Sequence, residues 1–351
     1  MKKYQIVEIT ENLNHAGTKA TADFANIADG CGYERVNIRM NTTKPGKVAK
    51  VQRQIGFYFD WNKCYQAIEP NSVVIMQHPF HYPQLTRESV LLKLKEKKHV
   101  KFISIIHDVE ELRQFRYNNY YKAEFEFMLQ VADVIVVHND KMKNFFLEQG
   151  VDEKRLVSLE IFDYLQERND KKEVSFAKAI TVAGNLDTTK CGYVGTLDQI
   201  QNVEIHLYGP NFDSKLKENK NINYHGVLSP DEVPSVLKAG FGLVWDGDGI
   251  RGGMGQAGQY VRYNNPHKLS LYLSSGMPVV IWKEAAEAKF VEENGLGILI
   301  DSLDELSDII PNLNEEEFIE IRNNVKEISD KLLKGYFGKK AILEAEKQIG
   351  V

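Results

Sequence analysis

The segment "YNNPHKLSLYLSSGMPVV", residues 263–280, predicts a helix that leads directly into a buried strand. Leucines and a tyrosine recur at helical spacing in its middle, and Gly276 favours a helix end. The run "MPVVIW" (277–282) is short, apolar and rich in β-branched residues, as buried strands are. Asn265 should act as the N-cap and Pro266 as the first helical residue. A helix joined to a buried strand is the repeating unit of an α/β fold.

The same alternation extends over most of the chain. Helical stretches lie between short apolar runs, which predicts parallel sheets covered on both faces. The pattern breaks near residues 155–170, and the charged run "QERNDKKE" (166–173) favours a linker there. The expected strands are 4–9, 33–40, 72–77, 101–107 and 132–138 before this break, and 179–184, 203–209, 222–226, 240–245, 277–282 and 295–300 after it.

We therefore expect an α/β protein with two Rossmann-like domains, 1–165 and 166–313, whose parallel sheets face an interdomain cleft. Ligands of such folds bind at the carboxyl ends of the strands. The segment 314–351 should form two helices. Asn314, with Glu317 three residues later, is a variant capping box for the first of them.

Composition excludes several classes of function. The 351 residues carry a net charge of −5 and no large basic block, so nucleic-acid binding is not expected. No apolar run approaches the roughly 20 residues that span a bilayer. The N-terminus runs straight into a strand, so we expect no signal peptide. Cys31, Cys64 and Cys191 are scattered without metal spacing and fit a reducing cytoplasm.

The first turn of the helix near 266 contains two basic side chains, His267 and Lys268. A helix start carries partial positive charge, so a lysine there is unfavourable unless an anion compensates it. Backbone N–H groups and the helix dipole favour an anion, and the lysine adds a full charge. A bound diphosphate would satisfy this arrangement. The alternative is a solvated surface lysine.

Other residues of the second half are expected at the same sheet edge. Gly184, followed by Asn185, ends the first strand and lets the backbone approach a ligand, and Lys190 supplies a nearby cation. Tyr208 ends the next strand and offers an aromatic face to a base or a sugar. Asp246 follows the fourth strand.

Six segments carry a resemblance to a known family: "NHAGTKA" (14–20), "IHDVEELR" (106–113), "AGNL" (183–186), "GFGLVWDG" (240–247), "YNNPHKLSLYLSSGMPVVI" (263–281) and "NGLGILI" (294–300). With them the chain resembles the GT-B glycosyltransferases. It is closely similar to a bacterial subgroup that holds galactofuranosyltransferases of surface polysaccharide synthesis and glucosyltransferases that extend glycans on serine-rich adhesins. The combination is far more specific than any one segment.

The resemblance implies transfer of a hexose, galactofuranose or glucose, from a UDP-sugar to a glycan or lipid-linked sugar acceptor in bacterial surface polysaccharide or glycoprotein synthesis. Lys268 would bind the diphosphate, Tyr208 would contact the nucleotide, and Thr18 would approach the donor from the first domain. No metal or other cofactor is expected. The expected donor-site residues are Thr18, Gly17, Gly184, Asn185, Lys190, Tyr208, Asp246, Asn265, His267 and Lys268.

The resemblance also implies that the C-terminal helices, 314–351, pack back on the N-terminal domain. We further expect a cytoplasmic protein and a homo-oligomer. Peripheral association with the inner face of the membrane is left open.

The stereochemistry and the catalytic base are also open. Many retaining GT-B enzymes carry two glutamates eight positions apart near the phosphate site, but Tyr263 and Leu271 stand at those places here. An inverting enzyme needs a base. Asp108, next to His107 at a strand end, is the catalytic candidate. The alternative is that Asp108 caps the following helix.

Two further segments allow more than one interpretation. The aspartates of "DGDGIRGGMGQAGQ" (246–259) could hold Mg²⁺, although that use belongs to a different glycosyltransferase fold. Its glycines predict a mobile loop that either closes over substrate or is plainly flexible. "QHPFHYP" (77–83) places two histidines in a rigid turn. Together with "FRYNNYY" (115–121), it would line the acceptor site with aromatic faces or pack in the core.

Three functions remain as hypotheses. The first is a UDP-sugar glycosyltransferase. The second is a non-catalytic, nucleotide-sugar-binding partner subunit of a glycosyltransferase. The third is a two-domain sugar-nucleotide epimerase, which would need a dense set of acid and base residues that the sequence does not display.

Overall fold

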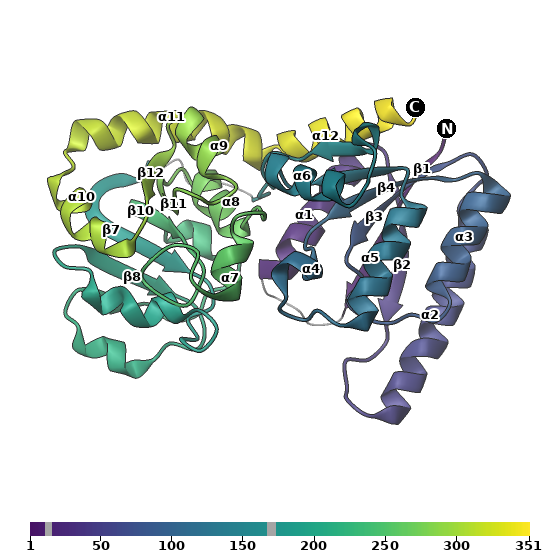
Figure 1. Cartoon of the computed structure of the whole chain (residues 1–351), viewed down its shortest axis with the longest axis horizontal. Helices are drawn as coiled ribbons and strands as arrows, with labels where there is room; N and C mark the ends of the chain where they lie inside the picture. Colours follow the sequence, from purple (N-terminus) through teal and green to yellow (C-terminus); the bar gives the residue numbers. More distant parts are fainter. Residues whose placement is uncertain (11–15, 167–172) are drawn as a thin grey trace. The chain divides into compact units, whose positions relative to one another are not determined.

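The computed structural model describes residues 1–10, 16–166 and 173–351, and the chain forms two compact units. Each unit contains one six-stranded, wholly parallel sheet covered by helices (Figure 1). The first unit comprises Met1–His138, Met142–Leu159 and Gly338–Val351, and the second comprises Asn139–Lys141 and Glu160–Phe337. The expected α/β class and the two Rossmann-like sheets are therefore confirmed.

The first sheet has the strand order β2-β1-β3-β4-β5-β6. Its strands are β1 (Lys3–Thr10), β2 (Glu34–Met40), β3 (Val73–His78), β4 (Lys101–Ile106), β5 (Val134–Val137) and β6 (Leu156–Ser158). The helices between them are α1 (Ala16–Gly30), α2 (Lys47–Ala67), α3 (Arg87–Lys98), α4 (Glu110–Arg113), α5 (Asn119–Val131), α6 (Asp140–Glu148) and the 3-10 turn η1 (Glu153–Arg155).

Strand β6 is the element of this sheet that the sequence did not predict. It has three residues and lies where we expected the linker to begin. Its backbone pairs with β5, from Ile135–Leu156 to Val137–Ser158. Because the strand still belongs to the first sheet, the first unit extends to Leu159 and the second begins at Glu160.

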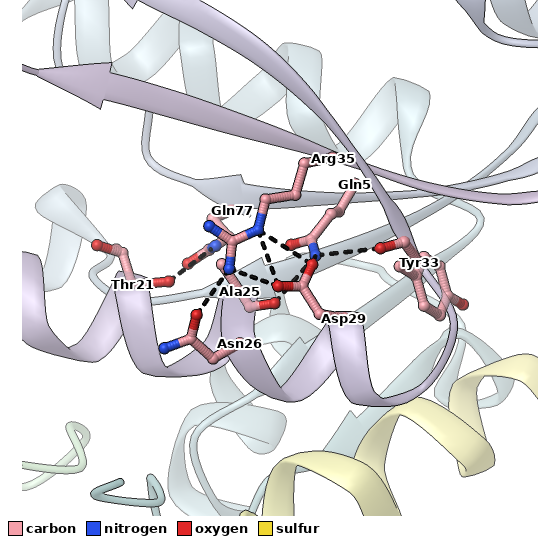
Figure 2. Close-up of polar contacts among 8 residues, drawn as sticks. All are labelled: Gln5, Thr21, Ala25, Asn26, Asp29, Tyr33, Arg35 and Gln77. Atoms are coloured by element: carbon pink, nitrogen blue, oxygen red, sulfur yellow. Dashed lines mark hydrogen bonds and ion pairs between the residues drawn. The ribbon is translucent and has the colours of Figure 1, made fainter. Parts of the chain in front are cut away.

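Helix α1 is fixed to the first sheet by polar side chains (Figure 2). The Gln5 amide of β1 donates to Asp29 Oδ1 at 2.6 Å, and Arg35 of β2 forms an ion pair with the same carboxylate at 2.6 Å. Gln77 of β3 donates to the Thr21 carbonyl at 3.1 Å. These bonds join the second and last turns of α1 to three neighbouring strands.

The second sheet has the strand order β12-β11-β10-β7-β8-β9, and all six expected strands are present. The strands are β7 (Ser175–Ala183), β8 (Glu204–Tyr208), β9 (Ile222–Tyr224), β10 (Ala239–Val244), β11 (Val279–Trp282) and β12 (Gly297–Ile300). The α-helices are α7 (Gly255–Tyr260), α8 (His267–Ser274), α9 (Ala288–Glu293), α10 (Leu306–Asn312) and α11 (Glu315–Leu333), with 3-10 turns η2 (Gly192–Gln199), η3 (Ser214–Glu218), η4 (Val233–Ser235) and η5 (Leu303–Glu305).

Helix α8 is the helix expected from the opening segment, but it begins one residue later. Pro266 has extended backbone angles and is the N-cap, and His267 is the first helical residue. Asn265 does not cap the helix. Its amide donates to the Glu160 carbonyl at 3.2 Å instead. The helix ends before Gly276, whose φ of 78° suits glycine.

Tyr272 attaches α8 to the centre of the second sheet. Its hydroxyl donates to the Thr181 carbonyl at 3.1 Å and accepts from the Ala183 N–H at 2.8 Å. Its ring lies directly over Gly242 of β10, where an added Cβ would be 2.2 Å from the ring. Only a residue without a side chain allows this approach, so Gly242 helps to set the position of α8.

The two C-terminal helices belong to different units. The expected capping box is present at Asn314 and Glu317. The apolar side of α11 packs within the second unit, where the Phe318 ring lies 5.3 Å from Phe241. We expected both helices on the N-terminal domain, and for α11 this is wrong, because its apolar stripe covers the second sheet.

Helix α12 (Tyr336–Gln348) lies mostly in the first unit, from Gly338 onward. Its buried Glu346 forms an ion pair with Lys3 at 2.8 Å and accepts from the Tyr33 hydroxyl at 2.8 Å.

Across the described part of the chain, no helix combines the length and apolar character needed to cross a membrane.

Candidate functional site

The candidate site lies where the strand order of the second sheet reverses, between β7 and β10. Ligands of open α/β sheets bind outside the carboxyl ends of the strands at this point. Lys268 of α8 reaches it, and its Nζ donates to the Trp245 carbonyl at 2.6 Å and to Asp246 Oδ1 at 2.7 Å. Gly184 follows β7, and a Cβ added there would lie 3.9 Å from Lys268 Cε. The structure therefore brings Gly184, Asp246 and Lys268 together.

The charge of Lys268 is compensated within the protein. Its side chain is 21% exposed and that of Asp246 is 27% exposed. The ammonium also lies 5.6 Å from the centre of the Tyr193 ring. Burial alone would lower the pKa of Lys268, but Asp246 and Tyr193 outweigh it, and the pKa is raised. Lys268 is therefore charged at neutral pH.

This ion pair corrects one expectation. We treated the lysine as an unfavourable charge in the absence of a ligand, but Asp246 compensates it. The two residues are 22 positions apart, and only the fold shows that their side chains meet.

Tyr208 lies beside this group at the end of β8. The Gly184 N–H donates to the Tyr208 carbonyl at 2.9 Å, which ties the two strand ends together. One face of the Tyr208 ring stacks on His225 with 4.7 Å between ring centres and 15° between planes. His225 Nε2 lies 3.0 Å from His206 Nδ1. The histidine pair thus holds the tyrosine ring in place, a support that the sequence analysis missed.

The loop after β7 carries two more expected residues. Asn185 is exposed, and its Oδ1 accepts from the side chain of Asn211 at 2.8 Å, which joins this loop to the one after β8. Lys190 is exposed in the turn that follows. Both lie in the same loop as Gly184, at the edge where the candidate site is built.

Asn265 and His267 have structural contacts of their own. Asn265 is 4% exposed and bonds to the Glu160 carbonyl. The His267 ring packs on Tyr164 with 4.9 Å between ring centres. These contacts hold the start of α8 against residues 160–164, so they position the helix that carries Lys268.

The glycine-rich loop after β10 is folded back on itself. The Asp248 N–H donates to the Met254 carbonyl at 3.0 Å, and the Gly252 N–H donates to the Asp301 backbone carbonyl at 2.9 Å. A Cβ added at Gly252 would lie 2.1 Å from the Trp282 ring. We expected these glycines to make the loop mobile, but the structure uses them for close packing.

One of the two aspartates considered as Mg²⁺ ligands is already paired. The carboxylate of Asp246 is engaged by Lys268. Within residues 1–10, 16–166 and 173–351, no group of three or more His, Cys, Asp or Glu side chains is arranged to hold a metal ion.

The catalytic candidates His107 and Asp108 follow β4 in the first unit. Asp108 Oδ2 forms an ion pair with Arg113 at 2.7 Å. The N-cap of α4 is Val109, which makes no side-chain capping bond. His107 Nε2 lies 2.6 Å from Gln77 Oε1, and the Gln77 amide bonds to α1. Asp108 is therefore held by an arginine, and His107 is held by the glutamine that anchors α1.

The other first-unit candidates lie at the start of α1. Gly17 and Thr18 are in its first turn, while Asn14 and His15 of the same segment lie outside the described residues.

In "QHPFHYP", His78 is 3% exposed and pairs with Glu124 at 2.9 Å, so it is a core residue. His81 is exposed, with Nδ1 3.2 Å from the Tyr121 hydroxyl.

Comparison with known families decides what kind of protein has this site. Residues 3–161 match the domain described as "Glucosyltransferase 3-like, N-terminal domain", and residues 180–345 match "Glucosyltransferase 3-like, C-terminal domain". The chain belongs to the glucosyltransferase 3-like family. The two matches cover both sheets, so this glucosyltransferase 3-like chain carries both domains that define the family.

Named relatives extend over most of its length. The chain is 27% identical to the beta-1,6-galactofuranosyltransferase WbbI of Escherichia coli K12, over 95% of both chains. It is 28% identical to Glucosyltransferase 3 of Streptococcus gordonii, over 79% of this chain and 80% of that one. The fold is similar to that of Anabaena HepE, solved in complex with UDP-glucose, with a TM-score of 0.63, 10% identity and full coverage of both chains. The GT-B fold expected from the sequence is thereby confirmed.

Proposed function

We propose that this glucosyltransferase 3-like chain is a UDP-sugar glycosyltransferase that moves a hexose, galactofuranose or glucose, to a glycan or lipid-linked sugar acceptor. The observation that carries the proposal is the Lys268–Asp246 pair at the strand-order reversal of the second sheet. It places a cation beside the start of α8 and the glycine that ends β7, where backbone and side chain can both meet a diphosphate. The names of the relatives support the choice of hexose.

Each donor-site residue then has a task. Lys268 holds the diphosphate, and Asp246 keeps the lysine charged and oriented until the donor arrives. Gly184 leaves room for the phosphates beside the lysine. Tyr208, supported by His225, contacts the nucleotide. Gly17 and Thr18 contact the donor from the first unit.

A turnover assay tests the function. The purified chain is incubated with UDP-galactofuranose, UDP-glucose or UDP-galactose and a set of glycan acceptors. Release of UDP and sugar isomerisation are both followed. We expect acceptor-dependent release of UDP with one of these donors. Isomerised UDP-sugar without release would indicate an epimerase, and tight UDP binding without turnover would indicate the non-catalytic partner subunit.

We propose that the reaction needs no divalent ion, because the helix start and Lys268 take the place of a metal at the diphosphate. Turnover should therefore persist in excess EDTA. Activity that is lost in EDTA and restored by Mg²⁺ or Mn²⁺ would overturn this and make the aspartates at 246 and 248 metal ligands.

Self-association is the further property we propose, with α2 as the contact. One side of this helix is buried, and the other exposes a stripe of Val48, Val51, Ile55, Tyr58 and Phe59, each more than half exposed. Their spacings of three and four residues suit pairing with a second helix. The stripe contains no charged residue. Two residues of the stripe, Ile55 and Phe59, also line a hollow of about 460 Å³ together with Asn41, Thr42, Gln52 and Gly56. This hollow would receive a side chain of a second copy.

Light scattering after size-exclusion chromatography tests this proposal. A Val51→Glu/Ile55→Glu variant should dissociate the oligomer to a monomer, whereas Lys50→Glu, off the stripe, should not. A wild-type monomer that sediments with anionic vesicles would instead make the stripe a peripheral membrane contact. In either case we expect the chain to act in the cytoplasm.

A further inference from the structure

A carboxylate without a role in the site above lies at the carboxyl end of β1. Glu8 is exposed to solvent on a strand that pairs with both β2 and β3. The strand order of the first sheet reverses between β1 and β3, as that of the second sheet reverses between β7 and β10. Glu8 therefore occupies the ligand-binding position of the first sheet.

Buried neighbours fix the orientation of this carboxylate. The Gln84 side-chain N–H₂ donates to Glu8 Oε1. The Trp61 indole N–H donates to Gln84 Oε1 at 2.6 Å, and both residues are almost fully buried. Because the indole occupies the oxygen of the Gln84 amide, the nitrogen must face Glu8. The carboxylate is thus held by a rigid pair, while part of the Glu8 residue remains exposed to solvent.

The surroundings of Glu8 suit proton transfer at neutral pH. Although Glu8 as a whole residue is exposed, protein atoms surround its carboxyl group, and this desolvation raises its pKa to about 7. Glu124 of α5 also raises the pKa, while Arg87 of α3 and the Gln84 hydrogen bond lower it. A base works best with a pKa near the working pH. Asp108, by contrast, is joined to Arg113 in an ion pair at 2.7 Å.

The loop that carries Gln84 also offers a surface for a sugar. Tyr82 in this loop is 44% exposed, and His81 beside it is exposed as well. Aromatic faces of this kind stack on the apolar faces of sugar rings. An acceptor sugar resting on Tyr82 would lie in the neighbourhood of the Glu8–Gln84 pair.

We propose that Glu8 is the general base that takes the proton of the acceptor hydroxyl. This rests on the proposed function. The acceptor oxygen bonds to the anomeric carbon of the donor, its proton passes to the Glu8 carboxylate, and the bond from the anomeric carbon to the UDP oxygen breaks with its electron pair on UDP. Glu8 then returns the proton to solvent. A single displacement of this kind inverts the anomeric configuration.

The test compares four variants of the full chain. Glu8→Gln removes the proton acceptor and keeps the shape, and Glu8→Asp keeps the charge but shortens the side chain. Glu34→Gln is the matched control, because Glu34 lies at the amino end of the neighbouring strand β2, away from Glu8. Asp108→Asn tests the other candidate base. The readouts are kcat against pH with the preferred donor and acceptor, UDP affinity by calorimetry, the melting temperature and the product anomer by NMR.

We expect kcat of Glu8→Gln to fall about 100-fold or more with UDP affinity within twofold of wild type. The acidic limb of the kcat profile, near pH 7 in the wild type, should disappear. Glu8→Asp should retain more activity than Glu8→Gln, and Glu34→Gln should match wild type. The product should have the inverted anomer.

Other results contradict the proposal in distinct ways. A folded Glu8→Gln with kcat within threefold of wild type and an unchanged acidic limb would overturn the role of Glu8 alone. Loss of activity only in Asp108→Asn would assign the base to Asp108. A retained anomeric configuration would exclude the single displacement. A wild-type chain that turns over no donor would instead refute the proposed function and this inference with it.

Discussion

At the scale of single residues, the charge of Lys268 is compensated by a residue that is distant in the sequence. Lys268 was expected from its place at a helix start, and its partner Asp246 was expected from a strand end. That the two form an ion pair at 2.7 Å was not. The pair compensates the charge of Lys268 and keeps the lysine at the strand-order reversal. An incoming diphosphate then competes with a carboxylate for the same ammonium.

A second ionisable side chain of this unit is buried, and within the described residues it forms no ion pair with a cation. Glu287 is 1% exposed, and the Asn139 amide donates to its Oε1 at 2.8 Å. Burial raises its pKa to about 8, against the usual 4.5, and Asp140 and Glu160 add to the effect. At neutral pH the folded protein therefore holds this side chain mostly protonated, while the unfolded chain ionises it.

Replacement of Glu287 should therefore change how stability depends on pH. Because the folded pKa is raised, the contribution of Glu287 to stability is complete below about pH 4.5 and is lost as the pH rises through about 8. Relative to Glu287→Gln, the wild type should lose roughly 1.4 kcal/mol of unfolding free energy per pH unit in this window. Urea unfolding from pH 5 to 9 measures it, with exposed Glu284→Gln as control. Parallel curves for wild type and Glu287→Gln would contradict the raised pKa.

At the scale of elements, α8 carries Lys268, the proposed diphosphate ligand, and its opposite side is held by the sheet. Tyr272 hydrogen-bonds to the backbone of β7 and covers Gly242 of β10. The position of Lys268 is thus set by a ring one helical turn further along α8 and by a glycine in the sheet. A change at Gly242 should disturb ligand binding although it touches no ligand.

Gly242→Ala tests this link. The new Cβ would lie 2.2 Å from the Tyr272 ring, so the ring and α8 must shift. We expect the unfolding free energy to fall by about 1–3 kcal/mol, as overpacked cores do, and UDP affinity to fall with it. The control is Gly195→Ala, whose Cβ would meet Thr188 at an ordinary 3.7 Å. Equal stability and affinity of Gly242→Ala and wild type would show that α8 is not set by this contact.

The elements were largely predictable from sequence, because apolar periodicity reports local burial. The eleven expected strands all formed, and the capping box at Asn314 was correct. The failures have physical reasons. Strand β6 has three residues, too few to show a period. The partner of α11 could not be read from its apolar stripe, because a stripe shows that a face is buried but not what covers it.

At the scale of the whole molecule, sequence predicted the fold and the sheet edge that the candidate donor-site residues share, but not the contacts among them. Strand ends placed Gly184, Tyr208 and Lys268 at one edge of the sheet, as found. Glu8 passed unnoticed because its supporting residue, Gln84, lies 76 positions away. A single acidic residue near the end of a strand cannot be recognised as functional from sequence, because its neighbours in the fold are distant in the chain.

The central claim is that the second unit binds a nucleoside diphosphate through Lys268, and calorimetric titration with UDP and uridine tests it most directly. In Lys268→Ala, loss of the charge-assisted contact should cost about 1.5–3 kcal/mol of UDP binding, or roughly 10-fold to 150-fold in affinity. Uridine, which lacks phosphates, should bind both proteins alike. The control Lys283→Ala removes a lysine paired with Asp301 at 2.8 Å elsewhere in the unit and should bind UDP as the wild type does. Equal UDP affinity of the wild type and a folded Lys268→Ala would contradict the account.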